Sequence, residues 1–187
     1  GEQAFEQSDL QIISFGNSVT EIKAKAFYNT NLTEIELPES VLTIGERSFA
    51  SNKLTKLVLN EGLISIGEAA FSSSLRHDSF YEPNWMSLVI PDSVEHIAQE
   101  AFSNYANYPA LQTVTFGLNL KTIGSRAFSS QALTQIRFHG DRPEFSGITF
   151  RTKAEQDLDG DNVQDHYQFT FEYCASREGW PGDDIEY

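Results

Sequence analysis

The sequence repeats itself with a period of 22 residues. The stretch "TEIELPESVLTIGERSF" covers residues 33–49, and "TKLVLNEGLISIGEAAF" covers residues 55–71 with the same apolar spacing. A fixed period in this range predicts a solenoid, in which each repeat forms one coil. A lone coil cannot bury its own apolar face, so only the stacked array is stable.

Pairs of a small residue and a phenylalanine mark the repeats. The unit reads L-x-x-I-x-L-x-x-x-V-x-x-I-x-x-x-A-F, and Trp85 stands in the leucine column of its unit. The I-x-L step has the two-residue spacing of a strand with one face inward. The I-G-x-x-A-F step predicts short extended or 3₁₀ segments on the outer side. The marking residues are Phe5, Phe27, Phe49, Phe71, Phe102 and Phe128.

These columns resemble the BspA-like leucine-rich repeat family, on the stretches "LTEIELPESVLTIGERSF" and "SLVIPDSVEHIAQEAF". The resemblance covers residues 2 to about 150. It implies an α/β-type repeat solenoid, mostly β: a curved right-handed array with one parallel sheet and a C-terminal β cap. The family is associated with surface and secreted proteins of bacteria and protozoa that bind host proteins, matrix or other cells, and no catalytic activity belongs to it.

The repeats predict two parts of the chain. Residues 1–138 form the leucine-rich repeats, with a truncated first unit and insertions in the units that start near residues 72 and 103. Residues 139–187 form a C-terminal cap, since "IRFHGDRPEFSGITF" and "FEYCASREGWPG" resemble the closing segment of such arrays. Because "QAF" already ends a unit, we expect the chain to be cut from a longer protein.

The two insertions are the first candidate binding site. They occupy residues 72–84 and 103–110, at the same point of the coil, and should project from one edge. Tyrosine and tryptophan give a large contact area at low entropy cost, which suits recognition of a protein or a glycan. The alternative is that the loops bury their own rings as a small core. The candidate residues are His77, Phe80, Tyr81, Tyr105 and Tyr108.

The outward positions of the predicted strands form a second candidate surface. They grade from acidic through neutral to basic, which fits either a broad protein-binding face or an ordinary solvated sheet. The positions are Ile12/Ser14, Glu34/Glu36, Lys56/Val58, Ser87/Val89, Thr113/Thr115 and Gln135/Arg137.

An acidic loop in the tail reads "DLDGDNVQD". Its carboxylates have the spacing of calcium-loop positions 1, 3, 5 and 9, with a main-chain carbonyl at position 7. Asn162 replaces the usual glycine and Gln168 the usual bidentate acid, so a solvated hairpin tip is the alternative. A bound calcium ion would be structural. The predicted ligands are Asp157, Asp159, Asp161, Val163 and Asp165.

Composition excludes several classes of partner. The net charge of −14 disfavours nucleic acid and anionic lipid, and no stretch is apolar for long enough to span a membrane. The single cysteine, Cys174, forms no intrachain disulfide and carries no recognisable catalytic signature. The histidines are scattered without metal-ligand spacing.

These observations favour a non-enzymatic, extracellular or cell-surface recognition module that binds a protein or glycan through a solenoid edge or sheet face. Two alternatives stay open: a spacer segment of a larger surface protein, and the targeting arm of an enzyme whose catalytic domain lies outside this fragment. The sequence does not name the ligand.

Overall fold

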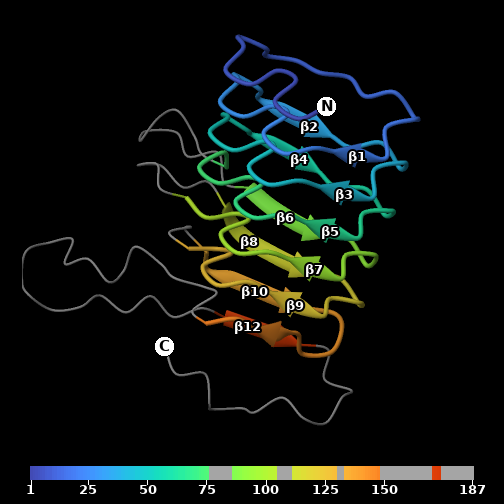
Figure 1. Cartoon of the computed structure of the whole chain (residues 1–187). Coiled ribbons are helices and arrows are strands. Elements are labelled where there is room, and N and C mark those ends of the chain that lie inside the picture. Colours follow the sequence, from blue (N-terminus) through green and yellow to red (C-terminus); the bar gives the residue numbers. More distant parts are fainter. Residues whose placement is uncertain (76–85, 105–110, 130–132, 148–169, 174–187) are drawn as a thin grey trace, which may run out of the picture.

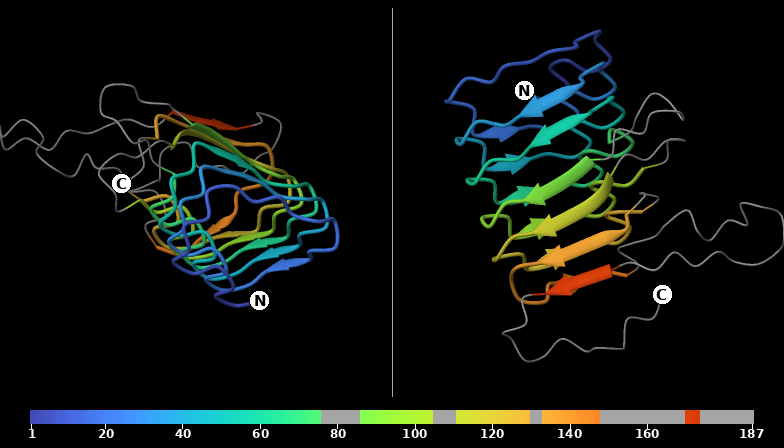
Figure 2. Two further views of the ribbon diagram at one scale, coloured as in Figure 1. Left: turned by 90° about the horizontal axis from the view of Figure 1, so that it is seen from above. Right: turned by 180° about the vertical axis from the view of Figure 1, so that it is seen from behind.

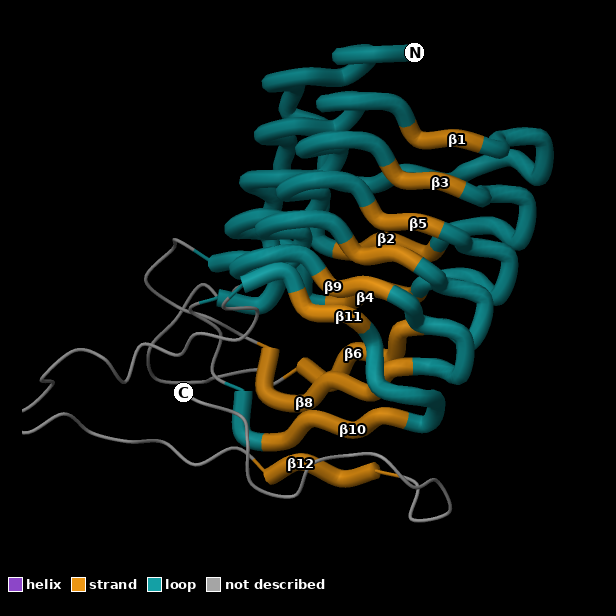
Figure 3. Tube along the Cα trace, turned by 60° about the horizontal axis from the view of Figure 1, so that its bottom comes forward, coloured by secondary structure: helices purple, strands orange, loops and turns teal. Residues whose placement is uncertain are grey.

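The computed structural model describes residues 1–75, 86–104, 111–129, 133–147 and 170–173 of the chain. Strands recur in every coil, and the described residues contain no helix (Figures 1 and 3). Coils lie one upon another along a single axis (Figure 1). The prediction of a repeat solenoid that is mostly β is therefore confirmed.

The first wall of the solenoid is built from the I-x-L step. Its strands are parallel and appear as a stack of arrows in the right-hand view of Figure 2. It divides into a two-stranded and a four-stranded sheet, with orders β2-β4 and β12-β10-β8-β6. The strands are β2 (Glu34–Glu36), β4 (Lys56–Val58), β6 (Met86–Ile90), β8 (Leu111–Phe116), β10 (Gln135–Phe138) and β12 (Thr170–Tyr173).

A second wall arises from the short segment before each repeat glycine. Its six strands are parallel in the order β1-β3-β5-β7-β9-β11, with the inward isoleucines in register. The strands are β1 (Glu21–Ile22), β3 (Thr43–Ile44), β5 (Ser65–Ile66), β7 (His96–Ile97), β9 (Thr122–Ile123) and β11 (Glu144–Phe145). The expectation of one parallel sheet was therefore wrong: each coil contributes a strand to each wall, because the V-x-x-I step is also extended.

The third wall is a ribbon of turns around the repeat phenylalanines, which we call the turn ribbon (residues 2–8, 24–30, 46–52, 68–74, 99–104 and 125–129). Within a coil, amides bond back three residues, as Ala26 does to Lys23. Between coils, the bonds run in one direction: Lys25, Phe27 and Asn29 donate to carbonyls of the next coil, and every later junction repeats this.

The backbone of the turn ribbon is left-handed two residues before each repeat phenylalanine and, in the units from Phe5 to Phe71, also two residues after it. None of these residues is glycine, although a left-handed residue costs roughly 1–2 kcal/mol. The expected extended or 3₁₀ conformation was therefore wrong for this wall, because alternate amides must turn toward the next coil. The residues are Gln3, Gln7, Lys25, Asn29, Arg47, Ser51, Ala69, Ser73, Glu100 and Arg126.

The phenylalanines form a continuous stack inside the turn ribbon. Phe27, Phe49 and Phe71 lie 5.2 and 5.3 Å apart between ring centroids, with planes within 8° of parallel. The stack continues from Phe71 to Phe102 at 5.2 Å and to Phe128 at 5.0 Å. The longer units therefore keep the same interior spacing as the regular ones.

The predicted leucine, isoleucine and valine columns form the rest of the core. Leu32, Leu54 and Leu111 are fully buried, as are Val41 and Val94. In the first coil the same columns are only partly buried, and Phe5 is 46% exposed. The core therefore runs along the whole stack as one cluster.

A row of buried polar side chains follows three residues after the phenylalanines. The Asn52 amide donates to the carbonyl oxygens of Phe27 and Phe49, each at 2.8 Å. Its Oδ1 accepts from the Leu32 amide at 3.1 Å and from the Thr30 hydroxyl. The Ser74 hydroxyl accepts a hydrogen bond from the main-chain N–H of Asn52 at 3.0 Å. This row satisfies backbone groups where the turn ribbon meets the first wall.

The repeat glycine allows neighbouring coils to approach closely. A Cβ at Gly67 would lie 2.7 Å from the Ile44 carbonyl oxygen, and one at Gly45 would lie 2.7 Å from the Ala24 nitrogen. Such contacts are too short for an ordinary side chain without a backbone shift. In the unit that ends at Phe102, Ala98 takes this place and still donates to the Ile66 carbonyl oxygen at 2.9 Å.

Two strands of the predicted cap continue the walls. β11 pairs with β9 in the second wall, and β12 pairs with β10 in the first wall. The segment after residue 138 therefore adds strands to the same two sheets.

Candidate functional site

The candidate residues of the two insertions and of the acidic loop lie outside the described residues. The proposed binding patch and calcium ligands therefore stay predictions. The residues are His77, Phe80, Tyr81, Tyr105 and Tyr108 for the patch, and Asp157, Asp159, Asp161, Val163 and Asp165 for the metal.

The roots of both insertions are described. Leu75 pairs with Leu54 as a parallel bridge, and Asn104 donates from its amide to the Ser129 carbonyl oxygen at 2.9 Å. The coil therefore continues to Leu75 and Asn104, past the sequence-based starts near residues 72 and 103. On the far side, Met86 pairs with Leu111 in the first wall. Both insertions thus leave the coil between the turn ribbon and the first wall.

The outward face of the first wall is acidic at β2 and apolar further along. Glu34 and Glu36 on β2 are exposed, and Lys56 lies 3.6 Å from the Glu36 carboxylate. Val58 is 40% exposed and Val89 is 62% exposed. The wall therefore presents apolar side chains at its centre, between an acidic β2 and the threonines of β8.

The ladder of the first wall is interrupted between β4 and β6. These strands belong to separate sheets, although β2 pairs with β4 and β6 pairs with β8. Leu57, an inward residue of β4, is only partly buried, whereas its counterparts Ile35 and Leu88 are fully buried. The interruption lies between the two strands that the first insertion separates along the chain.

The second wall is a surface that the sequence analysis did not include. Its outward column alternates with the inward isoleucines and holds small polar residues in the centre and charged ones at the ends. In the sequence, this outward column corresponds to the variable residue that precedes each isoleucine of the V-x-x-I step. The column is Glu21, Thr43, Ser65, His96, Thr122 and Glu144.

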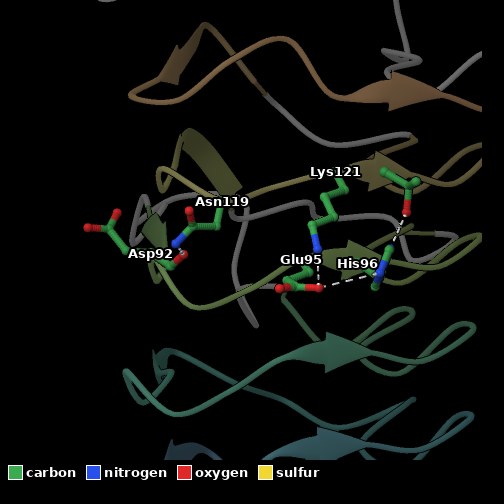
Figure 4. A network of polar contacts seen from close by, with 6 residues as sticks. Asp92, Glu95, His96, Asn119 and Lys121 are labelled. Carbon is green, nitrogen blue, oxygen red and sulfur yellow. Dashed lines mark hydrogen bonds and ion pairs between the residues drawn. The ribbon is translucent and has the colours of Figure 1, made fainter.

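A polar network covers the second wall in the two units that end at Phe102 and Phe128 (Figure 4). The Lys121 ammonium lies 2.6 Å from the Glu95 carboxylate, and the His96 ring nitrogen Nε2 lies 3.8 Å from it. His96 Nδ1 is 2.9 Å from the Thr122 hydroxyl. The hydrogen bond and charge of Lys121 lower the pKa of the Glu95 carboxyl below its usual value. The network joins two neighbouring coils across the wall.

The corner between the walls carries a second cross-coil contact. The Asp92 carboxylate accepts from the Leu118 amide at 2.9 Å, and the Asn119 side chain donates to the Asp92 carbonyl oxygen at 2.9 Å (Figure 4). These bonds fix one corner turn on the next. We therefore assign these bonds a structural role in the corner turn.

Neither network forms a metal centre. Within the described residues, no group of three or more histidine, cysteine or acidic side chains could hold a metal ion. His96 contacts one carboxylate and one hydroxyl, and its neighbour Lys121 already neutralises that carboxylate.

A family model for the BspA-type leucine-rich repeat region matches this chain in six copies, over residues 1–80 and 73–178. The chain belongs to the BspA-type leucine-rich repeat family. A search of curated proteins and a search of solved structures each found no match. Within the described residues, no helix is long and apolar enough to cross a membrane.

Family membership confirms the resemblance drawn from the repeat columns. BspA-type repeats are an interaction or repeat module and are generally non-catalytic. The two exposed walls match that role, since straight columns of side chains repeat at the spacing of paired strands, about 4.8 Å.

Proposed function

We propose that this chain is a non-catalytic recognition module of an extracellular or cell-surface protein and that it binds a protein or a glycan. The observation that carries the proposal is the pair of exposed walls, whose side chains vary from coil to coil while the interior columns stay constant. A repeat scaffold of this kind presents an extended surface for a partner.

The apolar centre of the first wall supports a protein partner. Val58 on β4 and Val89 on β6 are exposed in neighbouring units of one wall. Apolar and aromatic side chains inside a polar rim are the composition of a protein-binding surface. The chain has more acidic than basic residues, so we expect the polar rim around this apolar centre to be acidic.

A binding screen tests this function. The chain would be presented to a glycan array and to a panel of extracellular matrix proteins, with a Tyr81→Ala/Tyr105→Ala/Tyr108→Ala variant as comparison. We expect saturable binding by the parent chain and at least a tenfold loss in the variant at unchanged circular dichroism. Melting of the fold without a specific loss of binding would reject the aromatic patch.

A spacer role is the second candidate, favoured by the continuous phenylalanine stack. A stack with constant 5.0–5.3 Å steps gives a rigid rod whatever the exterior carries. No saturable binding to any protein or glycan in the screen would favour the spacer.

We further propose that the loop around Asp159 and Asp161 holds a structural calcium ion, because closely spaced carboxylates repel one another unless a cation neutralises them. Calorimetry with calcium would show heat and a raised melting temperature. Neither change, or the same change in an Asp159→Asn/Asp161→Asn variant, would reject the site.

A further inference from the structure

The second wall of the regular coils carries an exposed apolar pair, Leu42 and Ile64. Each side chain is 42% exposed. They lie in neighbouring coils at the same position, because the Ile64 amide donates to the Leu42 carbonyl oxygen at 2.8 Å. The corresponding places in the next two units are taken by Glu95 and Lys121. The apolar pair is therefore specific to two coils.

Acidic side chains flank the apolar pair on both sides along the coil. Glu39 and Glu61 precede it at the corner turn, and all four flanking glutamates are exposed. The Asn60 side chain bonds to the Glu39 carbonyl oxygen at 3.2 Å, which places the two corner turns side by side.

On the other side, Glu46 and Glu68 follow the apolar pair beyond the repeat glycines. The Arg47 amide donates to the Glu68 carbonyl oxygen at 2.9 Å, so these residues also lie in adjacent coils. Residues 39–47 and 61–68 contain these four glutamates and one basic residue, Arg47. Its guanidinium lies 3.9 Å from Glu46, at the limit of an ion pair.

We propose that this flanked apolar pair is a docking site for an extended segment of another protein with apolar residues at its centre and lysine or arginine at both ends. The inference rests on the proposed recognition function and names the surface and the partner chemistry. Complementary charge would steer and orient the segment, and burial of Leu42 and Ile64 would supply the affinity. Because the glutamates flank the apolar pair along the coil, the segment would lie along the strand direction.

The test uses a synthetic peptide with the sequence Lys-Lys-Ser-Leu-Ser-Leu-Ser-Lys-Lys, added to the full chain labelled with ¹⁵N. We expect amide shift changes confined to residues 39–47 and 61–68. A peptide with serine in place of both leucines tests charge alone, and one with neutral glutamine in place of the lysines tests apolar contact alone. Both should bind at least about tenfold more weakly.

Matched variants locate the site. Leu42→Ser/Ile64→Ser should weaken the binding of the peptide about tenfold or more, while Val58→Ser/Val89→Ser, a pair with comparable exposure on the first wall, should change it less than twofold. Equal binding of the serine peptide would overturn the proposal, since it would show general attraction to an acidic protein. Equal loss in both variants would also overturn it.

The two proposals can fail separately. Capture of a matrix protein whose binding depends on Val58/Val89 or the tyrosines and not on Leu42/Ile64 would reject this docking site and keep the recognition function. Absence of any binding in both the screen and the peptide titration would reject both.

Discussion

At one position of the second wall, the regular coils (residues 32–75) carry Leu42 and Ile64, and the long coils (residues 86–129) carry Glu95 and Lys121. Beneath both pairs the isoleucines and phenylalanines keep the same register and ring spacing. The difference shows that interior and exterior are set independently. The interior fixes the coil, and the exterior can change from apolar to ionic within one step of the repeat.

The largest expected loss of stability comes from removing one phenylalanine ring from the regular coils and one from the long coils. Phe71→Ala and Phe102→Ala should each destabilise the chain by about 3–5 kcal/mol, since both rings are fully buried in the stack. Urea denaturation would measure both. Costs that differ by more than about 2 kcal/mol would show that the long coils have a weaker interior and would break the comparison.

The buried polar row gives the next largest effect. Asn52→Ala removes the donors to the Phe27 and Phe49 carbonyl oxygens and the acceptor of the Leu32 amide, and each unsatisfied group costs about 1–3 kcal/mol. We expect a total loss of roughly 2–4 kcal/mol in the same assay. Asn17→Ala, at an exposed position, is the control and should stay within about 0.5 kcal/mol of the parent.

The position of the repeat glycine gives a smaller difference in stability between the regular coils and the long coils. Gly67→Ala places a Cβ 2.7 Å from a backbone oxygen and should cost about 1–3 kcal/mol through crowding. Ala98→Gly, in the long coil, should cost only about 0.5–1 kcal/mol through backbone entropy. Thermal unfolding followed by circular dichroism compares them. If Gly67→Ala instead raised the melting temperature, neighbouring coils would be able to move apart without a loss of stability, which would contradict the crowding argument.

The smallest effect concerns the ion pair of the long coils. The lowered pKa of Glu95 means that Lys121 stabilises the charged carboxylate above the ordinary pKa, and this contribution is lost as pH falls through the lowered value. Lys121→Met should raise the pKa of Glu95 back toward its usual value, measurable by carbon NMR titration. Unfolding should change little, since the pair is solvent-exposed. An unchanged Glu95 pKa would contradict the assigned cause.

The interior was predictable from the sequence because burial leaves a strict period. The columns through Leu32, Val41 and Phe49 follow from spacing alone, and the structure buries all three. The row through Thr30, Asn52 and Ser74 also had a signal, a polar residue three positions after each of three successive repeat phenylalanines. It was missed because a polar residue is ordinarily assigned to the surface.

The turn ribbon and the second wall were not predictable by the same reasoning. A two-residue strand such as Thr43–Ile44 is too short to give an alternating pattern. Left-handed residues such as Lys25 and Arg47 carry no composition signal, since glycine and asparagine are the usual indicators. The candidate docking site depends on which wall Leu42 faces, so it became visible only with the second wall.

The one-way hydrogen bonds between coils give the turn ribbon an electrical polarity of its own. Amides of each coil point toward the next, so the peptide dipoles add along the stack much as they do in an α-helix. Carbonyl oxygens therefore face the end that holds Phe5, and N–H groups face the opposite end. At this wall, a segment that covers the first end would have to donate hydrogen bonds, whereas a segment that covers the other end would have to accept them.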